Sequence, residues 1–93
     1  MRDASAAIAA DLLAKYRDAA ERTGDPEVSV AMVASLEVHA LYKQLRETPE
    51  GRAGITALTL DANPQVRRWA ATHMLAWNRE AGRAALRELN RAP

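Results

Sequence analysis

The fold of this chain is decided by the stretch LDANPQVRRWAATH, residues 60–73. Asn63 is a preferred N-cap residue, and Pro64 suits the first helical turn, where its missing amide hydrogen is not needed. Behind this start, apolar and aromatic residues recur at three- and four-residue spacing, and they are Val66, Trp69, Ala70, His73, Met74 and Trp77. The stretch therefore predicts a turn followed by an amphipathic helix that runs to about residue 78.

The same start signals divide the rest of the chain into helices. Asp25-Pro26-Glu27 and Thr48-Pro49-Glu50 each combine a cap residue, a proline and a first-turn acid, and Gly24 stands where a helix-ending glycine is expected. Apolar spacing then predicts helices over residues 4–22, 26–47, 49–60, 64–78 and 79–89, with a frayed tail from residue 90 onward. Gly51 and Gly54 make the third of these helices a weak one.

Length and composition indicate one small domain over residues 1–93. The chain has 21 alanines, two tryptophans, two tyrosines and no phenylalanine, so helices can approach closely but each contact buries little area. The absence of cysteine excludes disulfides and suits a reducing cytoplasm, where we expect the protein. We expect no signal peptide and no membrane span, because the start is acidic and no apolar run approaches ~20 residues.

One helix-start pattern occurs twice along the chain. Asp25-Pro26-Glu27-Val28 and Asn63-Pro64-Gln65-Val66 are alike in composition and lie 38 residues apart. That period is close to the length of HEAT and armadillo repeats, although a cap followed by proline also begins many unrelated helices. We therefore predict an all-α stack of about five helices, arranged as two antiparallel pairs and a short terminal helix.

The turn at the centre of this pattern resembles the turn and second helix of a HEAT repeat. The residues that carry the resemblance are Leu58, Asp61, Asn63, Pro64, Val66, Arg67, Ala70 and Ala71. More broadly, residues 39–43 and 63–73 look like a family of small bacterial HEAT-like proteins that form a domain of unknown function, and the likeness is clearest over residues 36–89. The resemblance implies a fold and no activity.

The HEAT resemblance also implies a structural clamp at the turn. In that family the acid before the turn and the arginine after the valine bond to each other or to neighbouring repeats, which assigns this role to Asp61 and Arg67. The equivalent positions of the first repeat hold Thr23 and Ser29. A continuous ladder of acid–arginine pairs is therefore not expected.

Trp69, His73 and Trp77 are spaced four apart, so we expect their rings to lie along one side of the fourth helix. A functional interpretation makes them a column that grips a ligand or a flipped base. The alternative is that both tryptophans are core side chains and that His73 is hydrogen-bonded by one nitrogen between them. We favour the core interpretation, under which a leucine that fills the same volume could replace His73 at little cost.

Catalytic and metal-binding signals are weak. Ser35 and His39 are four apart, but no acid is placed to orient the histidine and no oxyanion donor is visible. Two histidines without cysteine or a carboxylate–histidine motif predict no metal site, and the four glycines form no phosphate loop. We therefore expect neither an enzyme nor a cofactor.

Charge is distributed unevenly along the chain. Residues 64–93 hold six arginines against two glutamates, a net charge of +4, which leaves −3 for residues 1–63 of a chain whose net charge is +1. Four arginines recur at four-residue spacing opposite the apolar stripe of the last helix, and they are Arg79, Arg83, Arg87 and Arg91. This column is a possible interaction surface for phosphates or an acidic partner, or simply a solvated helix face.

The second helix is apolar on two sides. Met32, Leu36 and Ala40, with Val28 and Val33 beside them, form a strip away from the main stripe. We expect another helix of the chain to cover this strip, with a second subunit as the alternative. The sequence as a whole favours a non-enzymatic protein-interaction or scaffold module, a monomer or weak homodimer with an unknown protein partner; the alternative is a small nucleic-acid-binding protein that uses the arginine column.

Overall fold

The structure, a computed structural model, describes residues 2–91 and the side chains of residues 4–91. This range contains five helices and no strand: α1 (Arg2–Arg22), α2 (Val28–Leu45), α3 (Pro49–Leu58), α4 (Pro64–Met74) and α5 (Arg79–Arg91). The predicted all-α class is confirmed. None of these helices is both long enough and apolar enough to cross a membrane.

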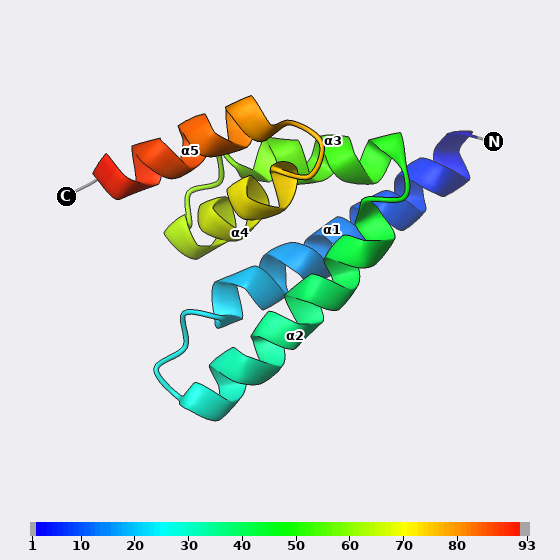
Figure 1. Cartoon of the computed structure of the whole chain (residues 1–93). Coiled ribbons are helices and arrows are strands. Elements are labelled where there is room, and N and C mark those ends of the chain that lie inside the picture. The colour runs from blue at the N-terminus through cyan, green and yellow to red at the C-terminus, as the bar shows by residue number, and fades with distance from the viewer. Residues whose placement is uncertain (1, 92–93) are drawn as a thin grey trace.

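Consecutive helices run in opposite directions, as the colours of Figure 1 show. The two longest helices, α1 and α2, form one antiparallel hairpin, and α3 and α4 pack over α1 as a second pair. Helix α5 then packs on α4 at the far end of the molecule. The stack therefore has two outermost helices, α2 on one side and α5 on the other.

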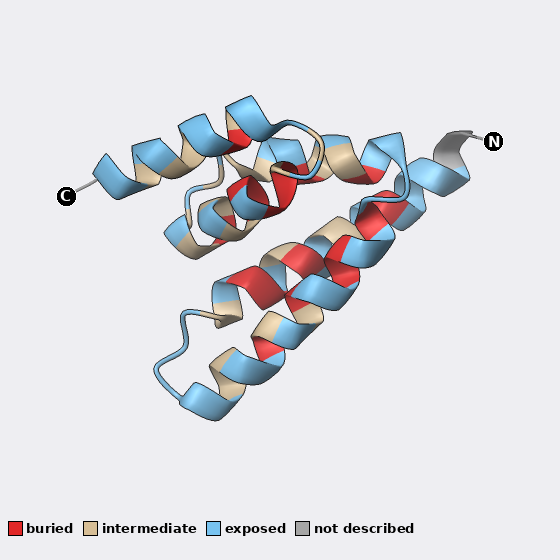
Figure 2. Ribbon diagram, in the orientation of Figure 1, coloured by how far each residue is buried: buried red, intermediate tan, exposed pale blue. Residues whose placement is uncertain are grey.

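The core lies where the first four helices meet, and the buried residues in Figure 2 follow their facing sides. Each of these helices supplies at least one of the largest fully buried side chains, which are Tyr16, Val38, Leu45, Ile55 and Val66. Small residues such as Ala19, Ala20 and Ala70 fill the gaps between them. Helix α5 buries only Gly82, because the apolar stripe predicted for it is only half-buried.

Two of the predicted helix caps are confirmed and one is wrong. Thr48 accepts a hydrogen bond from the amide of residue 51 at 3.0 Å, and Asn63 accepts two, from residues 65 and 66, at 2.9 and 3.2 Å. The Asp25 carboxylate instead accepts from the Glu27 amide at 2.8 Å and closes a turn, so α2 begins at Val28. Aspartate offers the backbone such a local turn in competition with helix. Gly24 does not adopt a positive φ.

The predicted ends of three helices are too late. Helices α2 and α3 end at Leu45 and Leu58, two residues early, and α4 ends at Met74 rather than near residue 78. Beyond Met74 the next three amides bond to carbonyls three residues back, which tightens the chain into turns. The Asn78 side chain then accepts from the Ala81 amide at 3.1 Å and caps α5. At the C-terminus, residues 90 and 91 belong to α5, while the rest of the expected frayed tail lies outside the described residues.

Gly51, predicted to weaken α3, is a point of close packing. A Cβ atom there would collide with the carbonyl oxygen of Leu45, and this contact belongs to backbone that cannot swing aside. Gly82 on α5 is similar, because a Cβ would come within 2.9 Å of the Ala71 carbonyl oxygen on α4. Both glycines therefore lower helix propensity but permit two helices to approach closely.

Candidate functional site

His73 lies at the centre of an aromatic cluster between α1, α2 and α4. Its ring stacks on Tyr42, with the centroids 3.9 Å apart and the planes 6° from parallel. Its Nδ1 atom is hydrogen-bonded to the Tyr16 hydroxyl at 2.7 Å. The residue is only 7% exposed and Tyr16 is completely buried. The cluster therefore joins the hairpin of α1 and α2 to α4.

Burial keeps both partners of this hydrogen bond uncharged. Desolvation, helped by the nearby His39, lowers the pKa of His73 to about 4, and desolvation also raises the pKa of Tyr16 above its usual range. At pH 7 the phenol O–H can therefore donate to an unprotonated Nδ1. His73 thus has a structural partner that requires a hydrogen-bond acceptor, so a leucine at this position would leave the Tyr16 hydroxyl unpaired, contrary to the expectation that it only fills volume.

Both tryptophans lie at the edge of the core and bond to neighbouring helices. Trp69 donates from Nε1 to the hydroxyl of Thr23 at 2.9 Å, just after the end of α1. Trp77 lies beyond the end of α4, in the turn before α5, and donates to Thr56 on α3 at 3.3 Å. Both rings are half-buried and packed against the core cluster. Each indole N–H is therefore hydrogen-bonded within the protein.

The Asp61 side chain ties the turn before α4 to α1. Its two carboxylate oxygens accept from Nε and an NH2 nitrogen of Arg17 at 2.8 and 3.0 Å, and one oxygen also accepts from the Asn63 amide at 2.9 Å. The guanidinium and that amide together hold the pKa of Asp61 below its ordinary value. This forked pair connects residues 44 positions apart and joins α1 to the turn between α3 and α4.

Arg67 contributes to the same turn in a different way from the expected clamp. It donates to the backbone carbonyls of Asp61 and Ala62, at 2.8 and 3.0 Å, and the carboxylate of Asp61 takes Arg17 as its ion-pair partner. Arg17 was not singled out from the sequence. In the sequence, Arg17 is simply one of several charged residues on the outer side of the first helix. Nothing in that pattern indicates a partner in the turn between α3 and α4.

The arginine column of α5 is exposed to solvent. Arg79, Arg83 and Arg87 line a shallow groove together with Glu80. Arg91, the fourth member predicted, is also exposed, and its guanidinium lies 3.8 Å from the carboxylate of Glu88. Three of the four arginines therefore share one concave surface, and the fourth is placed beside an acid.

The apolar strip on α2 contradicts the expectation that another helix covers it. Four of its side chains are largely exposed, and the fractions are 71% for Val28, 63% for Met32, 61% for Val33 and 73% for Leu36. Ala40 is exposed as well. The reason is geometric: α1 and α3 pack on the opposite side of α2, where Ala34, Val38 and Leu45 are buried, and α4 reaches that side through the stack of His73 on Tyr42. The strip is therefore an uncovered surface of the described chain.

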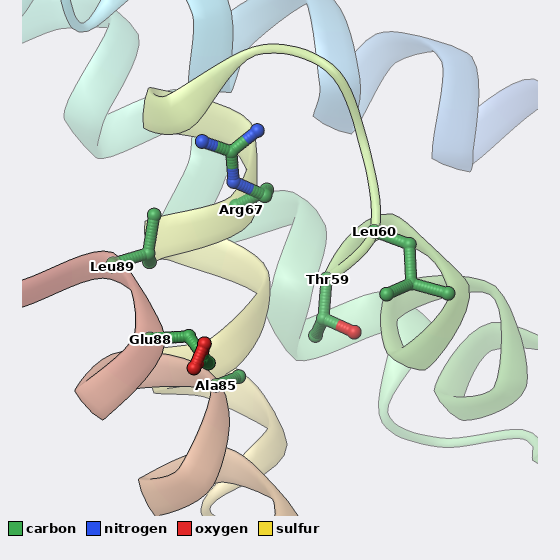
Figure 3. A pocket seen from close by; sticks show the side chains of 6 residues that line it. All are labelled: Thr59, Leu60, Arg67, Ala85, Glu88 and Leu89. Atoms are coloured by element: carbon green, nitrogen blue, oxygen red, sulfur yellow. The ribbon is translucent and has the colours of Figure 1, made fainter. Parts of the chain in front are cut away.

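Two shallow grooves lie near residues discussed above. The first, shown in Figure 3, lies between the end of α3 and α5 and is lined by Thr59, Leu60, Arg67, Ala85, Glu88 and Leu89. Leu60, expected on the apolar face of the third helix, is 87% exposed because α3 stops before it. The second groove borders Trp69 and includes Ser35, whose hydroxyl donates to the Ala31 carbonyl at 2.9 Å. This bond lies within α2 and involves no histidine.

The comparisons with known proteins add no relative. No protein-family model, curated protein or solved structure matches this chain. Among the side chains of residues 4–91, no three acidic or histidine residues gather as a group that could hold a metal ion. The surfaces that remain are the apolar strip of α2 and the arginine groove of α5, at opposite ends of the stack.

Proposed function

We propose that this protein is a non-enzymatic protein-interaction module and that the apolar strip of α2 is its contact surface. The observation that supports this proposal is the exposure of Val28, Met32, Val33 and Leu36 on one side of a single helix, each at 61–73%. Large apolar side chains scattered singly on a surface need no explanation, but a contiguous group of them marks a contact site in many soluble proteins.

The energetics favour an occupied strip. Removing apolar surface from water stabilises a complex by roughly 25 cal/mol per Å² before the costs of association. The rest of α2 already packs against α1 and α3, so its position is held without a partner and little ordering is needed on binding. A preformed, rigid apolar helix face suits a protein partner that presents an apolar face of its own.

A HEAT-like architecture is part of the proposal. It is supported by the 38-residue spacing of the two helix starts, by the antiparallel helix pairs and by the Arg17–Asp61 bond between the pairs. Repeat proteins of this kind stack helix pairs, and their outer helix faces are available to partners. In this proposal α2 supplies such a face.

Site-directed photocrosslinking tests the contact surface in the cells from which the protein comes. A photoreactive amino acid replaces Leu36 on the strip, and the matched control replaces Ala53, an exposed residue of α3. We expect an adduct of defined mass at position 36 and none at position 53. Equal labelling at the two positions, or no protein adduct at position 36, would overturn the proposal.

Nucleic-acid binding is a second candidate, supported by the groove that Arg79, Arg83 and Arg87 share. If it is correct, duplex DNA or RNA should bind with an affinity that falls steeply as salt rises, because bound counterions are released. Changing these three arginines to glutamine should abolish that binding, while the same change at the exposed cations Lys15, Lys43 and Arg68 should weaken it less. Absence of binding by the parent protein at low salt would eliminate this candidate.

A further inference from the structure

The strip on α2 has charges of opposite sign at its two ends. Asp25 and Glu27 precede the first turn of α2, and Lys43 and Arg46 lie at its carboxyl end. Arg46 is 3.7 Å from the neighbouring Glu47, whereas Lys43 has no acidic group within 4 Å among the described residues. An apolar strip with an acidic end and a basic end is complementary to a reversed copy of itself.

We infer that the strip binds a second copy of this chain, with the two α2 helices packed antiparallel about a two-fold axis next to Leu36. This inference rests on the proposed function and names the partner for the same surface. A two-fold interface is self-complementary by necessity, since the same patch is used on both subunits. Antiparallel packing also sets the positive end of each helix dipole beside the negative end of the other.

The positions along α2 fit this arrangement. Leu36 lies near the middle of the strip, so each copy would place it against the Leu36 of the other. At equal distances from the axis, the long side chain of Met32 would face the small Ala40, which lets large and small residues interdigitate. Glu27 would then lie across from the region of Lys43. A parallel pair would instead bring Glu27 beside Glu27 and Lys43 beside Lys43, which is repulsive.

The size of the strip sets the strength of the contact. One face of an 18-residue helix is about 27 Å long and offers less than the ~800 Å² per partner of a standard stable interface. We therefore expect a reversible dimer with a Kd of roughly 1–100 μM.

Sedimentation equilibrium of the full chain over roughly 1 μM to 0.5 mM tests the inference. The parent should change from monomer to dimer in this range. Leu36→Glu, which brings two carboxylates together at the axis, should raise the dissociation constant by roughly 100-fold or more. Ala53→Glu on α3 should dimerise like the parent. Melting curves at 1 μM check that each variant is folded, which is expected because Leu36 is 73% exposed.

Charge exchange tests the antiparallel direction. Glu27→Lys and Lys43→Glu should each weaken self-association by roughly tenfold, because both of the symmetric end contacts become repulsive. An equimolar mixture of the two variants should recover the parent affinity, since every end contact between unlike copies is again attractive. Variants that do not weaken dimerisation, or a mixture that does not recover it, would overturn the antiparallel arrangement.

The two proposals fail in different ways. A parent that remains monomeric to 0.5 mM, or a dimer insensitive to Leu36→Glu, overturns self-association. If photocrosslinking at position 36 then yields an adduct with a different protein, the proposed interaction function survives with another partner. If the parent is monomeric and position 36 also yields no protein adduct in cells, both proposals fail.

Discussion

The two outermost helices of the stack, α2 and α5, differ in what they present to solvent. Each packs one side against the rest of the molecule. The outer side of α5 carries Arg79, Arg83 and Arg87, whereas the outer side of α2 carries Val28, Met32 and Leu36. The outermost helix at one end of the stack therefore presents a charged side to solvent, and the outermost helix at the other end presents an apolar side.

The difference shows that the number of buried residues on a helix depends on which other helices pack against it, and not only on how many apolar residues it contains. Helix α5 has little apolar surface and buries a glycine to approach α4 closely. Helix α2 has more apolar residues than its neighbours within the chain can cover. The contrast can be tested by comparing substitutions on the inner and outer sides of α2 and on α5.

The largest expected effect is on the inner side of α2. Leu45→Ala should lower the free energy of unfolding by roughly 2–5 kcal/mol, because Leu45 is 1% exposed and its loss leaves a cavity between α1, α2 and α3. Leu36→Ala, the same change on the outer side, should alter it by less than about 0.5 kcal/mol when urea unfolding is measured at 1 μM protein. Equal losses for the two variants would contradict the inner and outer assignment.

The free energy of unfolding should also depend on pH, by a similar amount, because of His73, which stacks on Tyr42 on the inner side of α2. The folded protein holds the pKa of His73 at about 4, below its ordinary 6.5, so the unfolded chain binds a proton that the folded chain excludes between these values. The free energy of unfolding is therefore unaffected by His73 above pH 6.5. It falls as the pH is lowered toward 4, by roughly 3 kcal/mol in total. Urea unfolding at intervals between pH 4 and 7.5 measures it.

The control for this pH effect removes the imidazole and the hydroxyl together. The double variant His73→Leu with Tyr16→Phe should lose most of the slope between pH 4 and 6.5, because neither group then needs a proton or a partner. His73→Leu alone should be less stable than the double variant at pH 7, since the buried Tyr16 hydroxyl is left unpaired. An undiminished slope in the double variant would show that another group titrates in this range.

A smaller effect is expected at the bond that joins the two halves of the stack. Asp61→Ala removes the acceptor for Arg17 and for the Asn63 amide, and it should cost about 1–2 kcal/mol in thermal or urea unfolding. Asp11→Ala is the matched control, because Asp11 pairs with Lys15 on the exposed side of α1. If the two variants melt together, the Arg17–Asp61 bond does not hold the helix pairs in place.

The smallest effect is expected on the outer side of α5. Changing Arg79, Arg83 and Arg87 together to glutamine should shift the melting temperature by no more than about 2 °C, because these side chains are exposed and pack against nothing in the core. A larger loss in differential scanning calorimetry would mean that the column stabilises α5 and is more than a solvated surface.

Local signals predicted the class and much of the helix order. Thr48 and Asn63 cap the helices that their side chains suggested, because an N-cap is a contact within three residues. The errors came from competing local choices: Asp25 closes a turn in place of a cap, and Asn78, assigned to the end of the fourth helix, caps the fifth. A turn and a helix cap both arise because short polar side chains accept hydrogen bonds from nearby backbone amides. The spacing of such residues in the sequence therefore does not show which of the two will form.

Contacts between distant residues were largely beyond the sequence. His73 was expected to bond through one nitrogen, but its partner Tyr16 lies 57 residues away. Arg17 was not identified because its acceptor Asp61 is brought near it only by the packing of α4 on α1. The uncovered strip was visible in the sequence as a second apolar side of α2. Its exposure depends on which side of α2 the other helices occupy, and this is a property of the whole stack.

The fluorescence of the two tryptophans reports on the contacts that α4 and the turn after it make with other helices. Trp69 reports on the contact with the end of α1, and Trp77 reports on the contact with α3, because each indole is hydrogen-bonded there. The outer side of α2 carries no tryptophan. Intrinsic fluorescence is therefore a built-in probe of the packing around α4, and unfolding can be followed without an added dye.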